Sequence, residues 1–151
     1  MNKLEQALWE AERHASALTD ALAEWKASPP QSLQQVETDR GTRRMADQLL
    51  FRFLELQDAL GERLVPATLA ALLEPDVDRP MLDKLNRLDR LGYLRLDDWL
   101  GWRDLRNRLS HEYPEQPELR WATLKAAVLA AEDMLRTYTH WRVRLTRQTA
   151  A

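Results

Sequence analysis

The sequence contains no cysteine and only four glycines among its 151 residues. The absence of cysteine excludes disulfide bonds and thiolate chemistry. The scarcity of glycine, together with many Leu, Ala, Glu and Arg residues, favours helices. No stretch alternates with a period of two for long enough to predict a strand, and no internal repeat is present. The sequence therefore predicts an all-α protein.

Long hydrophobic runs are also missing. No run approaches the roughly 18 apolar residues that suggest a membrane span, and Met1 to Gln6 lack the apolar core of a signal peptide. We therefore expect a cytoplasmic protein with no membrane contact. A chain of this length, with 44% hydrophobic residues, can bury one core, so we assign residues 1–151 to a single domain. The net charge of −2 argues against a protein that coats nucleic acid nonspecifically.

Recognisable cofactor and metal motifs are absent as well. The three histidines, His14, His111 and His140, have no H-x-x-x-H spacing. There is no P-loop, G-x-G-x-x-G or G-x-S-x-G pattern. We expect no metal site and no cofactor. We interpret His14, beside the apolar face of the first helix, as a flank or packing residue, and His140 as an exposed residue near the end of the last helix.

Apolar spacing predicts four to six helices, which we expect to form an up-and-down bundle. The first, residues 2–27, carries a heptad seam whose partner lies either inside the bundle or on a second chain. Residues 28–38 form a connecting loop with a possible short turn. The remaining helices are expected from Thr38 or Asp39 to Leu60, over 64–74, from Pro80 to Leu91, from Asp97 or Asp98 to about Ser110, and over 118–147.

Several residues predict where these helices begin and end. Gly61 is expected to terminate the second long helix, and Gly92 is expected to cap the helix that runs from Pro80 to Leu91. Asp97 or Asp98 is expected at an N-cap. The inner side of the helix that follows is expected to consist of Trp99, Leu100, Trp102, Leu105 and Leu109.

Chemically capable side chains gather at the end of that helix. Arg106, Asn107, His111 and Tyr113 form the pattern R-N-x-x-x-H-x-Y. In a continuous helix Arg106 and His111 would diverge by about 140°. Because prolines follow closely, we expect the helix to end near Ser110, which would let the histidine turn back toward the arginine.

The residue types suit chemistry on a phosphate. Histidine has an ordinary pKa of about 6.5 and transfers protons near neutral pH. Arg106 can bond two phosphate oxygens, and Arg103 and Arg108 make the local charge positive. The alternative is an ordinary solvated helix end, with Asn107 and Tyr113 as common helix-end and covering residues.

The pattern resembles the active-site motif of the HEPN superfamily, and Tyr113 resembles the tyrosine of its HepT-like toxin branch. The resemblance implies a homodimeric helical bundle in which two R-x-x-x-x-H motifs meet. His111 would act as acid or base, Arg106 would bind the phosphate, and Asn107 would orient either group. Arg103 and Arg108 would add substrate-binding charge. A separate nucleotidyltransferase antitoxin would modify Tyr113 with AMP.

The second long helix adds a further similarity. Arg52, Phe53, Gln57 and Asp58 resemble an R-F-x-x-x-Q-D segment of HepT-like proteins, so this region either completes the cleft or is a polar flank. Together these features predict a metal-independent RNA endonuclease toxin. RNA supplies its own nucleophile, the 2′-OH, so cleavage needs a base, an acid and cations. The alternatives are a non-catalytic dimeric bundle that binds a nucleotidyltransferase or nucleotide, and a purely structural helical adaptor.

Overall fold

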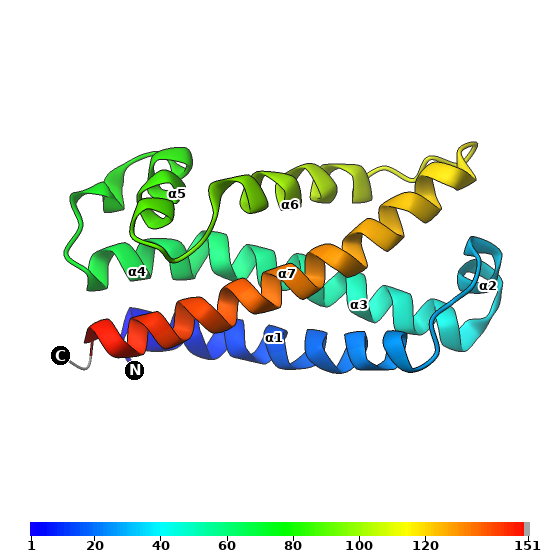
Figure 1. Cartoon of the computed structure of the whole chain (residues 1–151), viewed down its shortest axis with the longest axis horizontal. Helices are drawn as coiled ribbons and strands as arrows, with labels where there is room; N and C mark the ends of the chain where they lie inside the picture. The colour runs from blue at the N-terminus through cyan, green and yellow to red at the C-terminus, as the bar shows by residue number, and fades with distance from the viewer. Residues whose placement is uncertain (150–151) are drawn as a thin grey trace.

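The computed structural model describes residues 1–149, without the side chains at positions 76 and 77. These residues form an all-α bundle and contain no β-strand, as the sequence predicts. The long helices are α1 (Lys3–Ala27), α3 (Arg40–Ala59), α6 (Leu96–Leu109) and α7 (Pro117–Thr149). They run alternately up and down the bundle, so both ends of the chain lie at the same end of the molecule (Figure 1).

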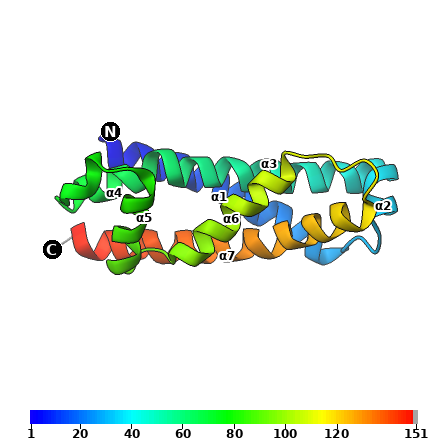
Figure 2. The ribbon, with the colours of Figure 1, turned by 90° about the horizontal axis from the view of Figure 1, so that it is seen from above.

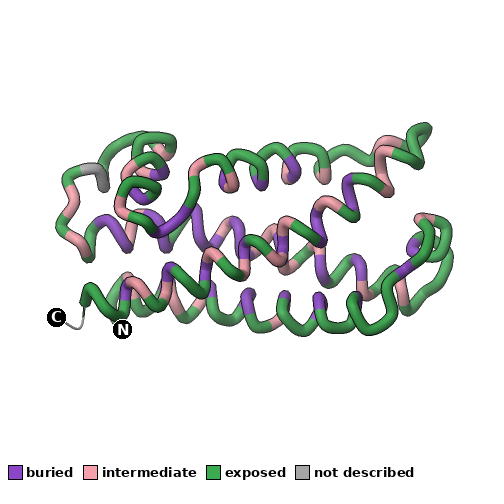
Figure 3. Tube along the Cα trace, viewed as in Figure 1, coloured by how far each residue is buried: buried purple, intermediate pink, exposed green. Residues whose placement is uncertain are grey.

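The heptad seam of α1 is buried inside the chain. Asn2 caps the helix, accepting the Glu5 N–H at 2.8 Å while the Glu5 carboxylate accepts the Asn2 N–H at 3.3 Å. Along the seam, Leu4 and Leu8 are partly buried, and the buried members are Ala11, Ala15, Leu18, Leu22 and Trp25. The helix packs chiefly against α3, and its buried face is purple in Figure 3. The partner of the seam is therefore in the same chain.

The loop after α1 contains a short helix, α2 (Leu33–Thr38), capped by Ser32. Asp39 then begins α3, as predicted, by accepting the backbone N–H of Thr42 at 2.9 Å and its hydroxyl at 2.6 Å. These hydrogen bonds stabilise the carboxylate and hold the pKa of Asp39 below its usual value. The short helix α2 lies at the end of the bundle where α7 begins (Figures 1 and 2).

The predicted stop at Gly61 is wrong. The helix continues from α3 through a π-helical turn, η1 (Leu60–Leu64), into α4 (Val65–Ala71). Gly61 is buried, and a Cβ atom there would lie 3.0 Å from the Trp99 ring. The missing side chain leaves room for the Trp99 ring of α6 against this turn. α4 ends at Ala71, earlier than predicted, and Leu73 follows with a φ of 58°.

The next segment contains a 3₁₀ turn, η2 (Pro75–Asp78), and α5 (Met81–Arg90). Gly92 follows α5 with a φ of +83°, which agrees with its predicted capping role. The predicted Asp97 or Asp98 cap is wrong. α6 begins at Leu96, and the Asp89 carboxylate accepts the Leu96 N–H at 2.7 Å. Leu100, expected on the inner side, is exposed.

α7 closes the bundle. Its buried stripe contains Ala127, Ala131, Tyr138 and Trp141 among others. The Trp141 indole N–H donates to the Thr68 hydroxyl of α4 at 3.0 Å, and both residues are fully buried. Within the part of the chain that the structure describes, no helix combines the length and apolarity needed to cross a membrane.

Candidate functional site

The motif side chains on α6 point in different directions. Trp99, Trp102 and Leu105 face the core. Arg103 and Asn107, one turn apart, are exposed. A helical step of about 100° explains the separation, since neighbouring residues cannot share one face. The motif therefore does not form one cluster within this chain.

Arg106 is held at the flank of α6 that faces α3. Its Nη1 lies 2.8 Å from Asp58 Oδ1, and its Nη2 donates to Asp58 Oδ2 at 3.2 Å. Nη1 also donates to the Leu54 carbonyl at 3.4 Å. This forked contact fixes the plane of the guanidinium. Because 39% of each charged side chain is exposed, the cation is oriented yet remains accessible to a ligand.

The other residues of the R-F-x-x-x-Q-D segment have different surroundings. Phe53 and Gln57 are buried in α3. Arg52 Nη1 lies 3.0 Å from His14 Nδ1. Because a guanidinium only donates, Nδ1 accepts and the proton of neutral His14 resides on Nε2. Asp58 is thus the member of this segment that contacts the motif.

His14 packs between α1 and α3. Burial lowers the pKa of His14. The negative charges of Glu55 and Glu10 raise this pKa, whereas the positive charges of Arg52 and Arg13 lower it further. Its Nε2 lies 3.9 Å from Glu55 Oε2. The arrangement agrees with a packing histidine.

His111 and Tyr113 lie in the loop that follows α6. Ser110 is the C-cap of the helix, and the His111 N–H donates to the Arg108 carbonyl at 3.1 Å. The His111 ring meets the Tyr113 ring edge-on, with centroids 5.7 Å apart and planes at 62°. Within residues 1–149, no hydrogen bond or ion pair joins His111 to Arg106. The expected return of the histidine toward the arginine is therefore not a direct contact in one chain.

A groove of about 700 Å³ opens beside this loop, between α2, α3, the end of α6 and α7. Apolar side chains form much of its surface: Leu33, Val36, Ala46, Leu50, Leu109 and Leu124. Arg43, Arg108 and His111 bring positive or proton-carrying groups to it, while Glu37, Asp47 and Glu112 bring negative ones. Arg106 belongs to the opposite flank of α6, because two helical steps from Arg108 turn about 200°.

The other basic residues differ in how far they are paired. Arg108 Nη2 pairs with Asp104 at 3.0 Å on the surface of α6. At the far end of α7, Arg142 pairs with Glu12, and the Arg144 guanidinium covers the Tyr93 ring at 5.4 Å. His140 is exposed, as predicted, and its Nε2 lies 2.7 Å from the Gly92 carbonyl. Arg142, Arg144 and His140 therefore all contact other parts of the same chain.

Among the described side chains, no group of three His, Asp or Glu residues is placed to hold a metal ion. No protein-family model matches the chain, and no curated protein or solved structure matches it. Fold and site together define an all-α bundle that carries an anchored, accessible arginine and an exposed histidine at one helix end.

Proposed function

We propose that this chain is a metal-independent RNA endonuclease of the HEPN type and the toxin of a toxin–antitoxin pair. The observation that carries the proposal is the state of the two central motif residues. Arg106 is oriented by Asp58 but still 39% exposed, and His111 is exposed in the loop that follows. A fixed cation and an unobstructed imidazole are the groups that phosphate cleavage requires.

The chemistry needs no bound nucleophile. The RNA 2′-oxygen attacks phosphorus, the bond from phosphorus to the 5′-oxygen breaks, and the products are a 2′,3′-cyclic phosphate and a 5′-hydroxyl. One imidazole accepts the proton of the 2′-OH, and a protonated imidazole donates to the departing 5′-oxygen. Arg106 neutralises the phosphorane, and Asn107 and Arg103, both exposed, lie beside it on α6.

A twofold dimer completes this site. One chain offers one motif histidine, whereas two apposed chains offer two histidines and two arginines. The seam of α1 is already occupied within the chain, which leaves the exposed end of α6 as the proposed interface. There, His111 of one chain would meet Arg106 of the other.

Tyr113 is the proposed site of control by a separate nucleotidyltransferase antitoxin. Its ring is in edge contact with His111. An AMP group on the phenolic oxygen would place negative charge and bulk beside the imidazole, by the same physical effects as phosphorylation. Cleavage would then stop without any change in the fold.

The test is cleavage of a labelled RNA in the presence of EDTA by the protein expressed alone. We expect cyclic-phosphate ends, no cleavage of DNA or 2′-O-methyl RNA, and loss of activity in His111→Gln and Arg106→Ala. The matched control is His140→Gln, which changes the other exposed histidine but keeps a donor for Gly92. Intact RNA with the wild-type protein, or equal rates in wild type and His111→Gln, would refute the proposal.

Expression with the neighbouring gene product tests the control by AMP. We expect the intact mass to rise by one or more AMP units as cleavage disappears, and no rise in Tyr113→Phe. A mass change that persists in Tyr113→Phe would place the modification elsewhere.

Nucleotide binding without cleavage is the second candidate. The groove beside Tyr113 favours it, since about 700 Å³ lies within the range of small-ligand sites and its surface is largely apolar. Saturable binding of a mononucleotide by a protein that leaves RNA intact would support this alternative. Retention of that binding in His111→Gln would separate it from catalysis.

A further inference from the structure

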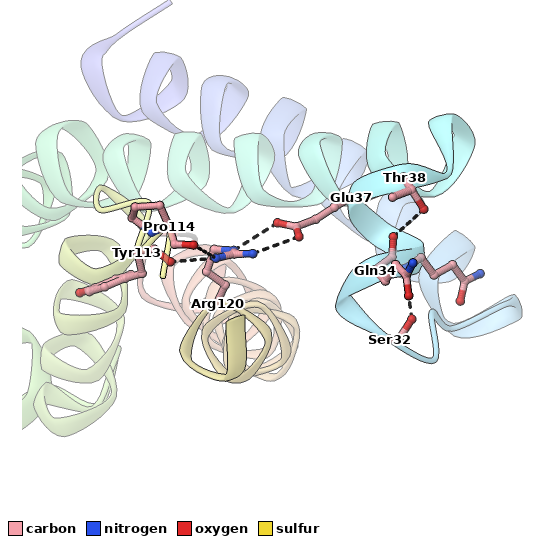
Figure 4. Close-up of polar contacts among 8 residues, drawn as sticks. Ser32, Gln34, Glu37, Thr38, Tyr113, Pro114 and Arg120 are labelled. Carbon is pink, nitrogen blue, oxygen red and sulfur yellow. Dashed lines mark hydrogen bonds and ion pairs between the residues drawn. The ribbon is translucent and has the colours of Figure 1, made fainter. Parts of the chain in front are cut away.

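Arg120 joins the motif loop to two other parts of the bundle (Figure 4). The residue lies in the first turn of α7. Its Nε and Nη2 donate to the two carboxylate oxygens of Glu37 at 3.2 and 3.1 Å. Its Nη1 donates to the carbonyls of Tyr113 and Pro114 at 2.8 and 3.2 Å. One guanidinium thus bridges α7, α2 and the loop that carries His111.

The loop has a backbone conformation that needs such support. Tyr113 has a φ of 47°, a left-handed value that is uncommon for a bulky residue. Its carbonyl accepts both the Arg120 guanidinium and the Gln116 N–H, the latter at 3.1 Å. Arg120 therefore fixes the peptide planes on the carboxyl side of Tyr113, and Figure 4 shows the Tyr113 ring directed away from Arg120. That orientation brings the ring to the edge of His111.

Glu37 makes the arrangement rigid. A forked pair between a guanidinium and a carboxylate fixes the plane of both groups, so the remaining Arg120 donors point in a set direction. The side chain of Arg120 is 25% exposed and that of Glu37 is 46% exposed. The four hydrogen bonds of Arg120 use all three nitrogens of its guanidinium, whereas the contacts of Arg106 with Asp58 and Leu54 use its two Nη atoms.

We infer that Arg120 and Glu37 are positioning residues for the His111–Tyr113 loop. They hold the loop through Tyr113 and Pro114 and set where the imidazole stands relative to α6. The catalytic meaning of this inference rests on the proposed ribonuclease function, whereas the predicted loop geometry can be measured without it. Lysine at position 120 would keep the charge but lacks the planar fork that serves Glu37 and two carbonyls together.

The experiment compares Arg120→Lys with wild type by NMR and hydrogen exchange. We expect loss of the nuclear Overhauser contact between the His111 and Tyr113 rings, and exchange of the Gln116 amide that is faster by roughly tenfold or more. The matched control is Arg136→Lys, which alters an arginine of the same helix whose partner, Asp133, is one turn away on that helix. The control should leave both signals unchanged.

Cleavage gives an independent readout. In Arg120→Lys we expect kcat to fall by about 100-fold with little change in KM, as for a misplaced catalytic group. Failure of the wild-type protein to cut RNA refutes the proposed function, but the ring contact still decides the positioning role. A retained ring contact and a protected Gln116 amide in Arg120→Lys overturn the inference.

A second variant guards against a folding defect. If Arg120→Lys does not fold, Glu37→Gln takes its place, because that carboxylate is half-exposed and its loss disturbs little packing. Glu37→Gln should weaken the ring contact and speed Gln116 exchange in the same direction. Signals identical to wild type in Glu37→Gln would overturn the inference.

Discussion

The hydrogen bond between Trp141 and Thr68 links α7 to α4 in the centre of the core. The indole N–H donates to the Thr68 hydroxyl at 3.0 Å, and both residues are 0% exposed. Thr68→Val replaces the hydroxyl with a methyl group of similar size. The variant leaves the packing nearly unchanged but deprives the buried indole N–H of its acceptor.

The expected cost is that of a buried donor without a partner, about 1–3 kcal/mol. For a chain of this length, each kcal/mol corresponds to a fall of about 2–4 °C in Tm, so we expect a decrease of about 2–12 °C. Trp141→Phe removes the donor. In that background Thr68→Val should cost close to nothing, because no indole N–H remains to be satisfied.

Urea and thermal unfolding followed by circular dichroism, all at one protein concentration, measure this cycle. The fixed concentration matters because the proposed dimer would make stability depend on protein concentration. A Thr68→Val protein within about 0.5 kcal/mol of wild type would contradict the reasoning, since surface substitutions already vary by that much. A coupling free energy near zero would contradict it equally.

Three further predictions follow from other contacts. Burial lowers the pKa of His14, so as pH falls the unfolded chain binds a proton at this histidine at a higher pH than the folded chain does. The free energy of unfolding should therefore decline as pH falls below about 6.5. Urea midpoints measured across this pH range should show that His14→Gln removes the decline. Asp58→Asn should change stability by less than about 1 kcal/mol, because 39% of each charged side chain is exposed, yet it should lower the proposed RNA cleavage roughly tenfold by freeing Arg106. Gly61→Ala should cost about 1–3 kcal/mol in unfolding measurements, because its Cβ would lie 3.0 Å from the Trp99 ring, whereas Gly101→Ala, with open space around it, should stabilise α6 by about 0.5–1 kcal/mol.

Local pattern predicted most of the helices correctly. The seam of α1 and the Asp39 start of α3 depend on spacing and on side chains within one turn, which can be recognised in sequence. The Gly92 cap belongs to the same class. Each of these features depends on residues three or four apart, where the physical interaction and the sequence pattern coincide.

Two of the errors fall where a distant residue replaces a local one. Gly61 resembles a terminator, but the ring of Trp99 makes it a packing position in a continuous helix. The start of α6 depends on Asp89 of the preceding helix rather than on Asp97 or Asp98. No local rule includes these partners, because they are defined only when separate helices pack.

The residues of the candidate site follow from sequence, whereas their contacts follow from tertiary structure. The sequence by itself determined an all-α bundle, and it located the chemically capable residues between Arg103 and Tyr113, because helix periodicity and residue chemistry are properties of the local chain. Only the tertiary structure decided that Asp58 anchors Arg106, that Arg120 and Glu37 hold the loop of His111, and that the arginines of α6 face different neighbours. These contacts join residues from 7 to 83 positions apart, and they form only once the helices and the loop have taken up their places in the fold.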